Sequence, residues 1–319
     1  MAYVYGPVPS RRLGRSLGID PLPFKTCNQN CVYCQLGRTR PLTSRRCCHT
    51  SATRVVEEVR LTLESGKAGP LDWLTFVGSG EPTLHGGLGT MIRAVRRLAP
   101  VPIAVITNGS LLCRPEVRKE LSCADAVLTC LDAGTELMYR RIHRPHPDLV
   151  FDQLLAGLLD FRRAFGGQLW IDVMLVKNVN DSDQAIEGIA GALARVMPDR
   201  IHVTVPTRPP AEAWVEPASR ERLLYARKLF GEIARSPGSC SHAVQVPFPR
   251  DPAVYFSEVI VRHPLCADDL RSWFGAPYQR EFTAALLQLT ARGQAQVVRR
   301  FGRDFWAGPA ARYEGHSPG

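Results

Sequence analysis

Short apolar runs alternate with stretches of helical periodicity over most of this chain. Residues 53–64 carry apolar side chains at helical spacing, whereas residues 71–77 form a nearly continuous apolar run of strand length. The same two patterns recur as far as residue 234. The strands predicted in this way are 16–20, 71–77, 101–106, 124–131, 168–176 and 200–205, and the helices are 53–64, 88–98, 115–121, 136–142, 151–165, 182–196 and 219–234.

Strands that alternate with helices at this spacing predict an α/β fold, in which a parallel sheet is covered by helices. The pattern contains about six strand–helix units, fewer than the eight of a closed barrel. Ahead of the first predicted strand, Gly6, Pro7 and Pro9 predict an extended, irregular lead-in.

The pattern changes in the last quarter of the chain. Residues 237–241 predict a boundary, and residues 242–246 fit one further strand. Beyond residue 262 the order helix, turn, helix, hairpin predicts a small winged-helix-like domain, with helices over 265–274 and 278–292 and short strands over 294–300 and 304–307. The predicted divisions are a barrel over 1–236, a connecting segment over 237–261 and the winged-helix-like domain over 262–319.

The length and composition fit a folded protein with one large domain and an appendage. The 319 residues are 45% hydrophobic, which is enough for a full core. The sequence contains no run of 18 apolar residues, so no membrane-spanning helix is predicted, and the first residues lack the pattern of a signal peptide. The 10 cysteines do not form a disulfide ladder in a chain of this length. A reducing, cytoplasmic location is therefore expected.

Charge adds a preference about partners. Lys and Arg number 40 against 30 Asp and Glu, so the net charge is +10, which favours nucleic acid or another anionic partner over a neutral one. A diffuse excess of solvated basic residues is the alternative. The pair Arg11–Arg12 fits an anion grip and a solvated pair equally well. Basic residues of the C-terminal domain that favour nucleic acid over protein docking are Arg280, Arg292, Arg299, Arg300 and Arg303.

The strongest chemical signal is a loop with three cysteines, Cys27, Cys31 and Cys34, at the spacing C-x3-C-x2-C. Thiolates favour zinc, copper(I) or iron–sulfur clusters. Structural zinc requires four ligands, and no fourth Cys or His lies close in sequence. Three thiolates suit a [4Fe–4S] cluster with one iron left open. The alternative is three unrelated thiols in a surface loop. A second group, the Cys-Cys-His triplet at 47–49, is interpreted as incidental, because adjacent cysteines rarely bind one metal ion.

Polar and glycine residues follow the predicted strands, where parallel-sheet folds bind their ligands. Glycines let a backbone approach a ligand closely, and a carboxylate follows them at the second strand. Each motif alone also fits a simple turn, so their repetition at successive strand ends carries the prediction. The candidate residues are Gly78, Ser79, Gly80 and Glu81 after the second strand, Thr107 and Asn108 after the third, Asp132 after the fourth, Asn178 after the fifth and Val205 in the sixth.

The cysteine spacing, with Tyr33 directly before the third cysteine, resembles that of the radical S-adenosylmethionine (SAM) superfamily. The wider pattern resembles a standalone subfamily grouped loosely with the wyosine-base tRNA-modifying synthases. Its motifs here are Gly-Pro-Val-Pro-Ser-Arg-Arg at 6–12, the cysteine loop at 25–37, Gly-Ser-Gly-Glu-Pro-Thr at 78–83 and Arg-Pro-Pro-Ala-Glu-Ala-Trp-Val-Glu-Pro at 208–217.

This resemblance implies a partial (β/α)6 barrel in which the three cysteines hold a [4Fe–4S] cluster and SAM binds its open iron. It implies that the 78–81 turn holds the amino group of SAM and that Asp132 binds the ribose. In this setting Tyr33 and Val205 are predicted beside the adenine. Asn178 is predicted to reach the methionine end, and helix capping by Asp181 or Ser182 is the simpler role for its turn. A ferredoxin or flavodoxin would donate the electron that converts SAM to methionine and a 5′-deoxyadenosyl radical.

The substrate remains open at this stage. RNA or tRNA modification is favoured, although Cys113, Cys123, Cys130, Cys240 and Cys266 are isolated and form no second cluster motif of the wyosine type. A protein- or peptide-modifying enzyme or activase is one alternative. An iron–sulfur sensor with a DNA-binding winged helix is another, but a sensor would not need polar residues at successive strand ends.

Overall fold

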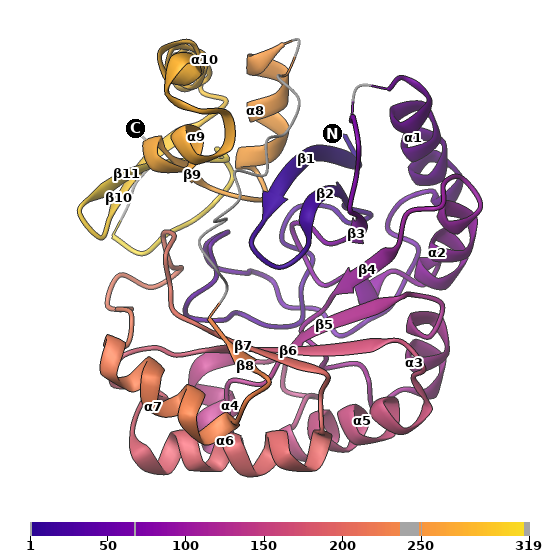
Figure 1. Ribbon diagram of the computed structural model, residues 1–319, viewed down its shortest axis with the longest axis vertical. Coiled ribbons are helices and arrows are strands. Elements are labelled where there is room, and N and C mark those ends of the chain that lie inside the picture. The colour runs from indigo at the N-terminus through magenta and orange to yellow at the C-terminus, as the bar shows by residue number, and fades with distance from the viewer. Residues whose placement is uncertain (1, 67, 237–248, 250, 316–319) are drawn as a thin grey trace.

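The computed structural model describes residues 2–66, 68–236, 249 and 251–315, and its largest element is one curved sheet (Figure 1). The predicted α/β fold with a parallel sheet is confirmed, since the strands from β2 onward run parallel. The eight strands are adjacent in chain order: β1 (Val4–Ser10), β2 (Gly14–Ile19), β3 (Trp73–Phe76), β4 (Ile103–Ile106), β5 (Ala126–Cys130), β6 (Gln168–Met174), β7 (Arg200–Thr204) and β8 (Ala234–Arg235).

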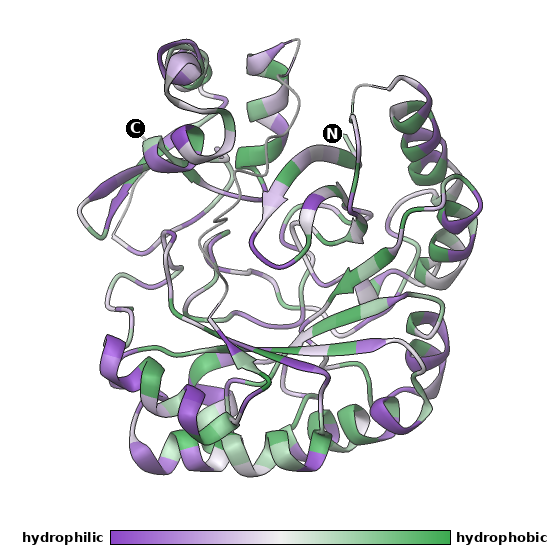
Figure 2. Cartoon of the chain, in the orientation of Figure 1, coloured by the Kyte–Doolittle hydropathy of each residue, from purple (hydrophilic) through white to green (hydrophobic). Residues whose placement is uncertain are grey.

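Helices cover the outer face of this sheet (Figure 1). Apolar residues on that face, such as Leu74 and Val105, are fully buried against helical residues such as Val59 and Leu158. The helices are banded with polar and apolar residues in Figure 2, as amphipathic helices are. They are α1 (Ala52–Glu64), α2 (Leu88–Arg96), α3 (Pro115–Leu121), α4 (Glu136–His143), α5 (Phe151–Ala164), α6 (Asp183–Val196) and α7 (Arg220–Phe230).

The lead-in predicted to be irregular is instead the strand β1, which pairs antiparallel with β2. Its prolines are tolerated because β1 is an edge strand and its register is irregular between Tyr5 and Val8. Proline within a central strand would remove a ladder hydrogen bond, whereas an edge has a row of N–H groups without partners in the sheet.

The helix predicted over 219–234 is wrong in its last turn. Ser219 caps the start of α7 by accepting a hydrogen bond from the Arg222 N–H, but the helix ends at Phe230. Gly231 follows with φ +86°, a conformation that stops a helix, and β8 begins three residues later. The predicted boundary at 237–241 and strand at 242–246 lie outside the described residues.

The C-terminal part has a second core and a three-stranded sheet of order β10–β11–β9. Phe256, Phe274 and Phe282 pack edge to face in that core. Its first helix, α8, falls in the segment predicted only to connect the two domains, and sequence analysis missed it. The elements are α8 (Pro252–Ile260), β9 (Leu265–Cys266), α9 (Ala267–Phe274), η2 (Ala276–Tyr278), α10 (Gln279–Ala291), β10 (Gln296–Arg300) and β11 (Arg303–Ala307).

This C-terminal part is fastened to the first strands of the sheet. The Tyr255 hydroxyl donates to the Pro7 carbonyl at 2.7 Å, and Arg262 forms a buried ion pair with Asp20 at 2.8 Å. The end of the chain then returns to the cysteine loop, where the Tyr313 hydroxyl donates to the Gln35 carbonyl at 2.7 Å. None of the helices in the described ranges is long and apolar enough to cross a membrane.

Candidate active site

The three cysteines lie on the loop that follows β2, and all are partly buried. The Cys34 N–H donates to the Cys31 carbonyl at 3.1 Å, which folds this part of the loop into a turn. The pKa of Cys27 is raised to about 12, mainly by burial and next by the charge of Glu81. Burial also raises the pKa of Cys31 well above its ordinary value, and the neighbouring thiols Cys34 and Cys27 contribute to that rise. The three thiols therefore share one short, partly buried loop.

Lys25 supports this loop from one side. Its Nζ lies 3.2 Å from the Cys34 Sγ and donates to the Gly37 carbonyl at 2.8 Å. On the other side, the Cys31 Sγ lies 3.3 Å from Nδ1 of His143. Burial lowers the pKa of His143 to about 3, so the ring is neutral at physiological pH.

In the described part of the chain, no group of three His, Cys, Asp or Glu side chains is arranged to hold a single metal ion. The 47–49 triplet has two exposed cysteines, and the Cys47 Sγ lies 3.3 Å from Nε2 of His49. The ligands of a single zinc ion all surround one centre. A four-iron cluster does not require such a group, because each cysteine binds a different iron.

The glycine-rich turn after β3 packs directly on the start of the cysteine loop. A Cβ on Gly78 would lie 2.0 Å from the Asp20 Cγ, and one on Gly80 would lie 2.1 Å from the Thr26 carbonyl oxygen. The Ser79 hydroxyl donates to Asp20 at 2.7 Å. The absence of side chains at the two glycines therefore lets the turn and the loop touch.

Glu81 is fully enclosed at the end of this turn, with 2% of its surface exposed. Its Oε1 accepts from the hydroxyls of Thr83 and Thr107 at 2.6 and 2.5 Å and from the Thr83 N–H at 3.0 Å. Its Oε2 accepts from the Asn108 N–H at 2.7 Å. Burial raises the pKa of Glu81, and these hydrogen bonds oppose the rise. Glu81 thus joins the ends of β3 and β4.

Asn108 continues this network to the cysteine loop. Its side-chain NH₂ donates to the Asn28 side-chain oxygen at 2.7 Å and lies 4.0 Å from the Cys27 Sγ. Asn28, which sequence analysis did not single out, donates in turn to the Ser110 hydroxyl at 2.8 Å. The only sequence signal for Asn28 was its place between two of the cysteines.

Asp132 lies at the end of β5 and is 1% exposed. It accepts from the Tyr33 hydroxyl at 2.5 Å and from the Met174 N–H at 2.7 Å, and its Oδ2 is 3.4 Å from Nε2 of His143. Burial raises the pKa of Asp132 to about 7, while both hydrogen bonds lower it. The Asn180 side chain fixes the Asp132 carbonyl at 2.9 Å.

The structure does not join the last two predicted contacts to this group. Asn178 is exposed, with φ +58°; its N–H donates to Asp181 at 2.8 Å and its carbonyl accepts from Arg141 at 3.0 Å. Val205 follows β7 and packs against the outer core. The residues brought together around the cysteines are therefore Tyr33, Gly78, Ser79, Gly80, Glu81, Thr107, Asn108 and Asp132.

Replacing Glu81 with glutamine should destabilise the protein even without cofactors. The new NH₂ group cannot accept a hydrogen bond, so one buried donor loses its acceptor, which costs about 1–3 kcal/mol. Urea unfolding of the apoprotein measures this. Glu57→Gln on the exposed side of α1 is the matched control, because Glu57 bonds only to Arg60 on the surface. Unchanged unfolding of Glu81→Gln would show that Glu81 has no structural role.

Comparison with known proteins finds a family whose model includes the cysteine loop. The family model described as "Radical SAM superfamily" matches residues 22–187, which is more than half of the chain and includes the cysteine loop and Asp132. The chain belongs to the radical SAM superfamily. This membership makes it an enzyme of the radical SAM type, and the cofactors of the superfamily are a [4Fe–4S] cluster and SAM.

Several curated proteins are similar in sequence to this radical SAM enzyme. UPF0026 protein MJ1312 of Methanocaldococcus jannaschii is 37% identical over 233 residues, which cover 73% of this chain and 72% of that protein. UPF0026 protein slr1464 of Synechocystis is 36% identical over 208 residues, covering 65% and 76%. A Brachyspira hyodysenteriae protein named "GTPase Obg" is 37% identical over 250 residues; they cover 78% of this chain but only 36% of that protein.

Among solved structures, a radical SAM methyltransferase from Sphaerobacter thermophilus aligns with a TM-score of 0.48 and 21% identity, covering 69% of this chain and 65% of that one. Streptococcus suis SuiB bound to SAM aligns with a TM-score of 0.43 and 16% identity, covering 60% and 39%.

The residues present fit the cofactors of the superfamily. Three thiols on one short loop match the ligand set of a cluster with an open iron. Beside them, buried polar groups follow β3, β4 and β5, and hydrogen bonds tie Asn108 to Asn28 and Asp132 to Tyr33 of the cysteine loop.

Proposed function

We propose that Cys27, Cys31 and Cys34 hold the [4Fe–4S] cluster and that SAM binds beside it, along the ends of β3, β4 and β5. The observation that carries this proposal is the hydrogen-bonded network from the cysteine loop through Asn28 and Asn108 to Glu81. When bound, the cluster supplies the electron that cleaves SAM to methionine and a 5′-deoxyadenosyl radical, which takes a hydrogen atom from the substrate.

The chain's own residues position the cofactors and exclude water. Lys25 places its ammonium group beside the Cys34 sulfur and holds that end of the loop through the Gly37 carbonyl. Tyr33 and Asp132 hold each other in place, so that the tyrosine ring lies beside the proposed adenine and the carboxylate faces the ribose. Glu81 acts mainly by fixing the 78–81 turn, with its backbone toward the amino group of SAM. Asn178 and Val205 stay as predicted contacts, at the methionine and adenine ends.

We further propose that the C-terminal part is a winged helix that presents RNA to the barrel. Its order of elements, α8–β9–α9–α10–β10–β11 with a three-stranded antiparallel sheet, supports this assignment. Arg280 and Arg292 on either end of α10 are exposed, as are Arg299 and Arg303 on the two strands of the wing. Tyr313 bonds to Gln35 of the cysteine loop and Glu314 to Arg38 directly after it, and these contacts would bring a bound substrate to the active site.

The reaction class is therefore hydrogen abstraction from an RNA such as tRNA, with a ferredoxin or flavodoxin as electron donor. The net charge of +10 supports an anionic substrate. A cytoplasmic location fits, because the described cysteines are all free thiols. Wyosine-type chemistry would need a second group of cysteines. Among the described residues no such group is present, because Cys113, Cys123, Cys130 and Cys266 are isolated.

tRNA binding is expected to weaken steeply as salt rises, because phosphate contacts release counterions. Replacing Arg280 or Arg292 with glutamine should weaken binding and reduce the slope of log K against log salt by about 1 for each lost phosphate contact. Fluorescence anisotropy with labelled tRNA at several salt concentrations measures this. Arg195→Gln, on the exposed end of α6, is the control with the same change of charge.

Absence of tRNA binding at low salt would remove the RNA proposal. It would leave a protein or peptide substrate that docks on the C-terminal part. Equal effects of Arg195→Gln and of the α10 variants would show that the charge, and not the winged helix, attracts the RNA.

A further inference from the structure

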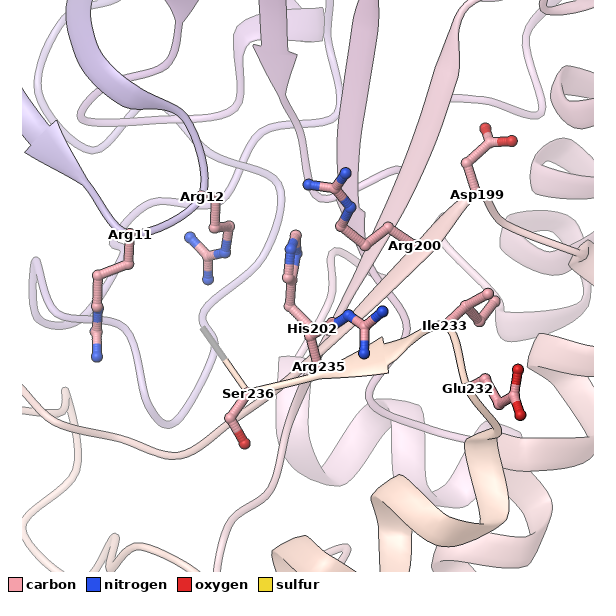
Figure 3. Close-up of a pocket in the computed structure, with 9 residues that line it drawn as sticks. All are labelled: Arg11, Arg12, Asp199, Arg200, His202, Glu232, Ile233, Arg235 and Ser236. Carbon is pink, nitrogen blue, oxygen red and sulfur yellow. The ribbon is translucent and has the colours of Figure 1, made fainter. Parts of the chain in front are cut away.

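A pocket of about 630 Å³ lies between the β1–β2 turn and the strands β7 and β8, apart from the cysteine loop. Four arginines line it: Arg11 and Arg12 from the turn, Arg200 from β7 and Arg235 from β8. In Figure 3 the side chains of Arg12, Arg200, Arg235 and His202 gather around one space. Its volume falls within the range of about 300–1,000 Å³ that is usual for small-ligand sites.

Protein contacts hold several of these cations in place. The Arg200 guanidinium stacks on the Trp170 ring, 4.4 Å from its centre. The Arg12 Nε lies 3.0 Å from the Asp172 Oδ1, and Arg11 donates to the Thr207 hydroxyl at 3.4 Å. Such contacts lower the entropy that each side chain would lose on binding a ligand. The pocket is therefore preorganised for an anion.

The acidic residues of the pocket do not balance its positive charge. Asp199 is already bound by the Arg162 guanidinium, at 2.9 and 3.0 Å, outside the pocket. Figure 3 shows the carboxylates of Asp199 and Glu232 at the far side, directed away from the gathered cations. Asp172 is shared between Arg12 and the His202 ring, whose Nδ1 lies 3.1 Å from it. Several guanidinium groups around one space are best satisfied by a phosphate, which accepts from more than one arginine.

His202 of the pocket belongs to a row of residues that crosses the sheet toward β5. Asp172 on β6 is in register with His202 on β7 and with Cys130 on β5, so the three form one row across neighbouring strands. Cys130 is the last residue of β5, two residues before Asp132. Trp170 on β6 packs in one apolar cluster with Leu13 and with residues of β4 and β5 such as Ala104 and Leu128. A substrate held in the pocket would have to extend along β6 and β7 to reach the cysteine loop.

We propose that this pocket binds a phosphate group of the substrate, and that the part of the substrate to be attacked extends along the inner side of β6 toward the cysteines. The inference rests on the proposed function only for the place where the radical forms. The phosphate can come from a small phosphorylated molecule or from the backbone of an RNA.

The test compares uridine 5′-monophosphate with uridine by isothermal titration calorimetry on the full chain. The monophosphate should bind saturably and roughly tenfold or more tightly than the nucleoside. Arg200→Gln and Arg235→Gln should each remove most of that difference, whereas Arg195→Gln should leave it unchanged. Both pocket arginines are exposed, so their replacement is compatible with folding, which thermal unfolding verifies. Equal affinity for nucleotide and nucleoside, or equal loss in the control variant, would overturn the proposal.

A second arm identifies the source of the phosphate. A single-stranded oligouridine with a 5′-hydroxyl end that binds in a manner dependent on Arg200 and Arg235 supports an RNA backbone. Binding of the mononucleotide alone supports a small phosphorylated molecule. No saturable binding of either one overturns the site.

The two proposals can fail separately. Formation of 5′-deoxyadenosine without substrate needs the cluster and SAM, whereas nucleotide binding measured by calorimetry needs neither, so the two measurements report on the two proposals separately. If the wild-type enzyme forms none while nucleotide binding is present, the proposed function fails and the phosphate site stands.

Discussion

Replacing Cys31 with alanine is expected to abolish formation of 5′-deoxyadenosine and to prevent stable assembly of the iron–sulfur cluster. With Cys31 removed, two of the three proposed thiolate ligands are left on the loop. Loss of a residue that only orients a metal ligand already costs about 10–100-fold in affinity or activity, and loss of a ligand costs more. Iron and sulfide content after anaerobic reconstitution, together with 5′-deoxyadenosine formed from SAM and dithionite, measures the effect.

The matched control is Cys123→Ala. Cys123 is a partly exposed thiol after α3, with an Arg93 nitrogen 3.6 Å from its sulfur. It should keep wild-type iron content and activity, because it is not part of the cysteine loop. Retention of a full cluster and of activity by Cys31→Ala would refute the assignment of Cys27, Cys31 and Cys34 as ligands.

Replacing Arg262 with methionine should destabilise the fold by about 3–5 kcal/mol, because it leaves the buried carboxylate of Asp20 without its cation. The two side chains are only 3% and 1% exposed. Arg262 also donates to the carbonyls of Ala2 at 2.6 Å and Glu258 at 3.0 Å, so both acceptors lose a partner. Methionine keeps much of the apolar volume of the arginine stem and leaves the loss of charge as the main change.

Urea unfolding of the apoprotein measures this effect. Arg60→Met on the exposed face of α1 is the control; Arg60 forms surface ion pairs with Glu57 and Glu64 and should change stability little. Because Asp20 also accepts from Ser79 in the glycine-rich turn, Arg262→Met should in addition lower the yield of reconstituted cluster. Equal stability of Arg262→Met and wild type would show that the Asp20 charge is solvated and that the domain contact is dispensable.

Most of the sheet could be predicted because the spacing of apolar residues within each strand and each helix is visible in its own stretch of sequence. The errors have local physical causes. β1 was missed because proline usually excludes strands, and only pairing at an edge makes Pro7 and Pro9 acceptable. The end of α7 was misplaced because Ile233 and Ala234 continue an apolar pattern past Gly231, whose positive φ stops the helix. α8 was missed because its packing partners, such as Phe282, lie far along the chain.

The sequence by itself determined the three cysteines, the parallel sheet and the set of polar residues at the strand ends, since spacing and periodicity are local properties of the chain. Only the tertiary structure decided which of those residues meet. It brought Glu81 and Asn108 onto the cysteine loop, placed His143 beside Cys31 and left Asn178 exposed on its turn. It also joined Arg11 and Arg12, ambiguous in the sequence, to Arg200 and Arg235 in one basic pocket. Such meetings depend on strand register and on the curvature of the sheet, which no short stretch of sequence specifies.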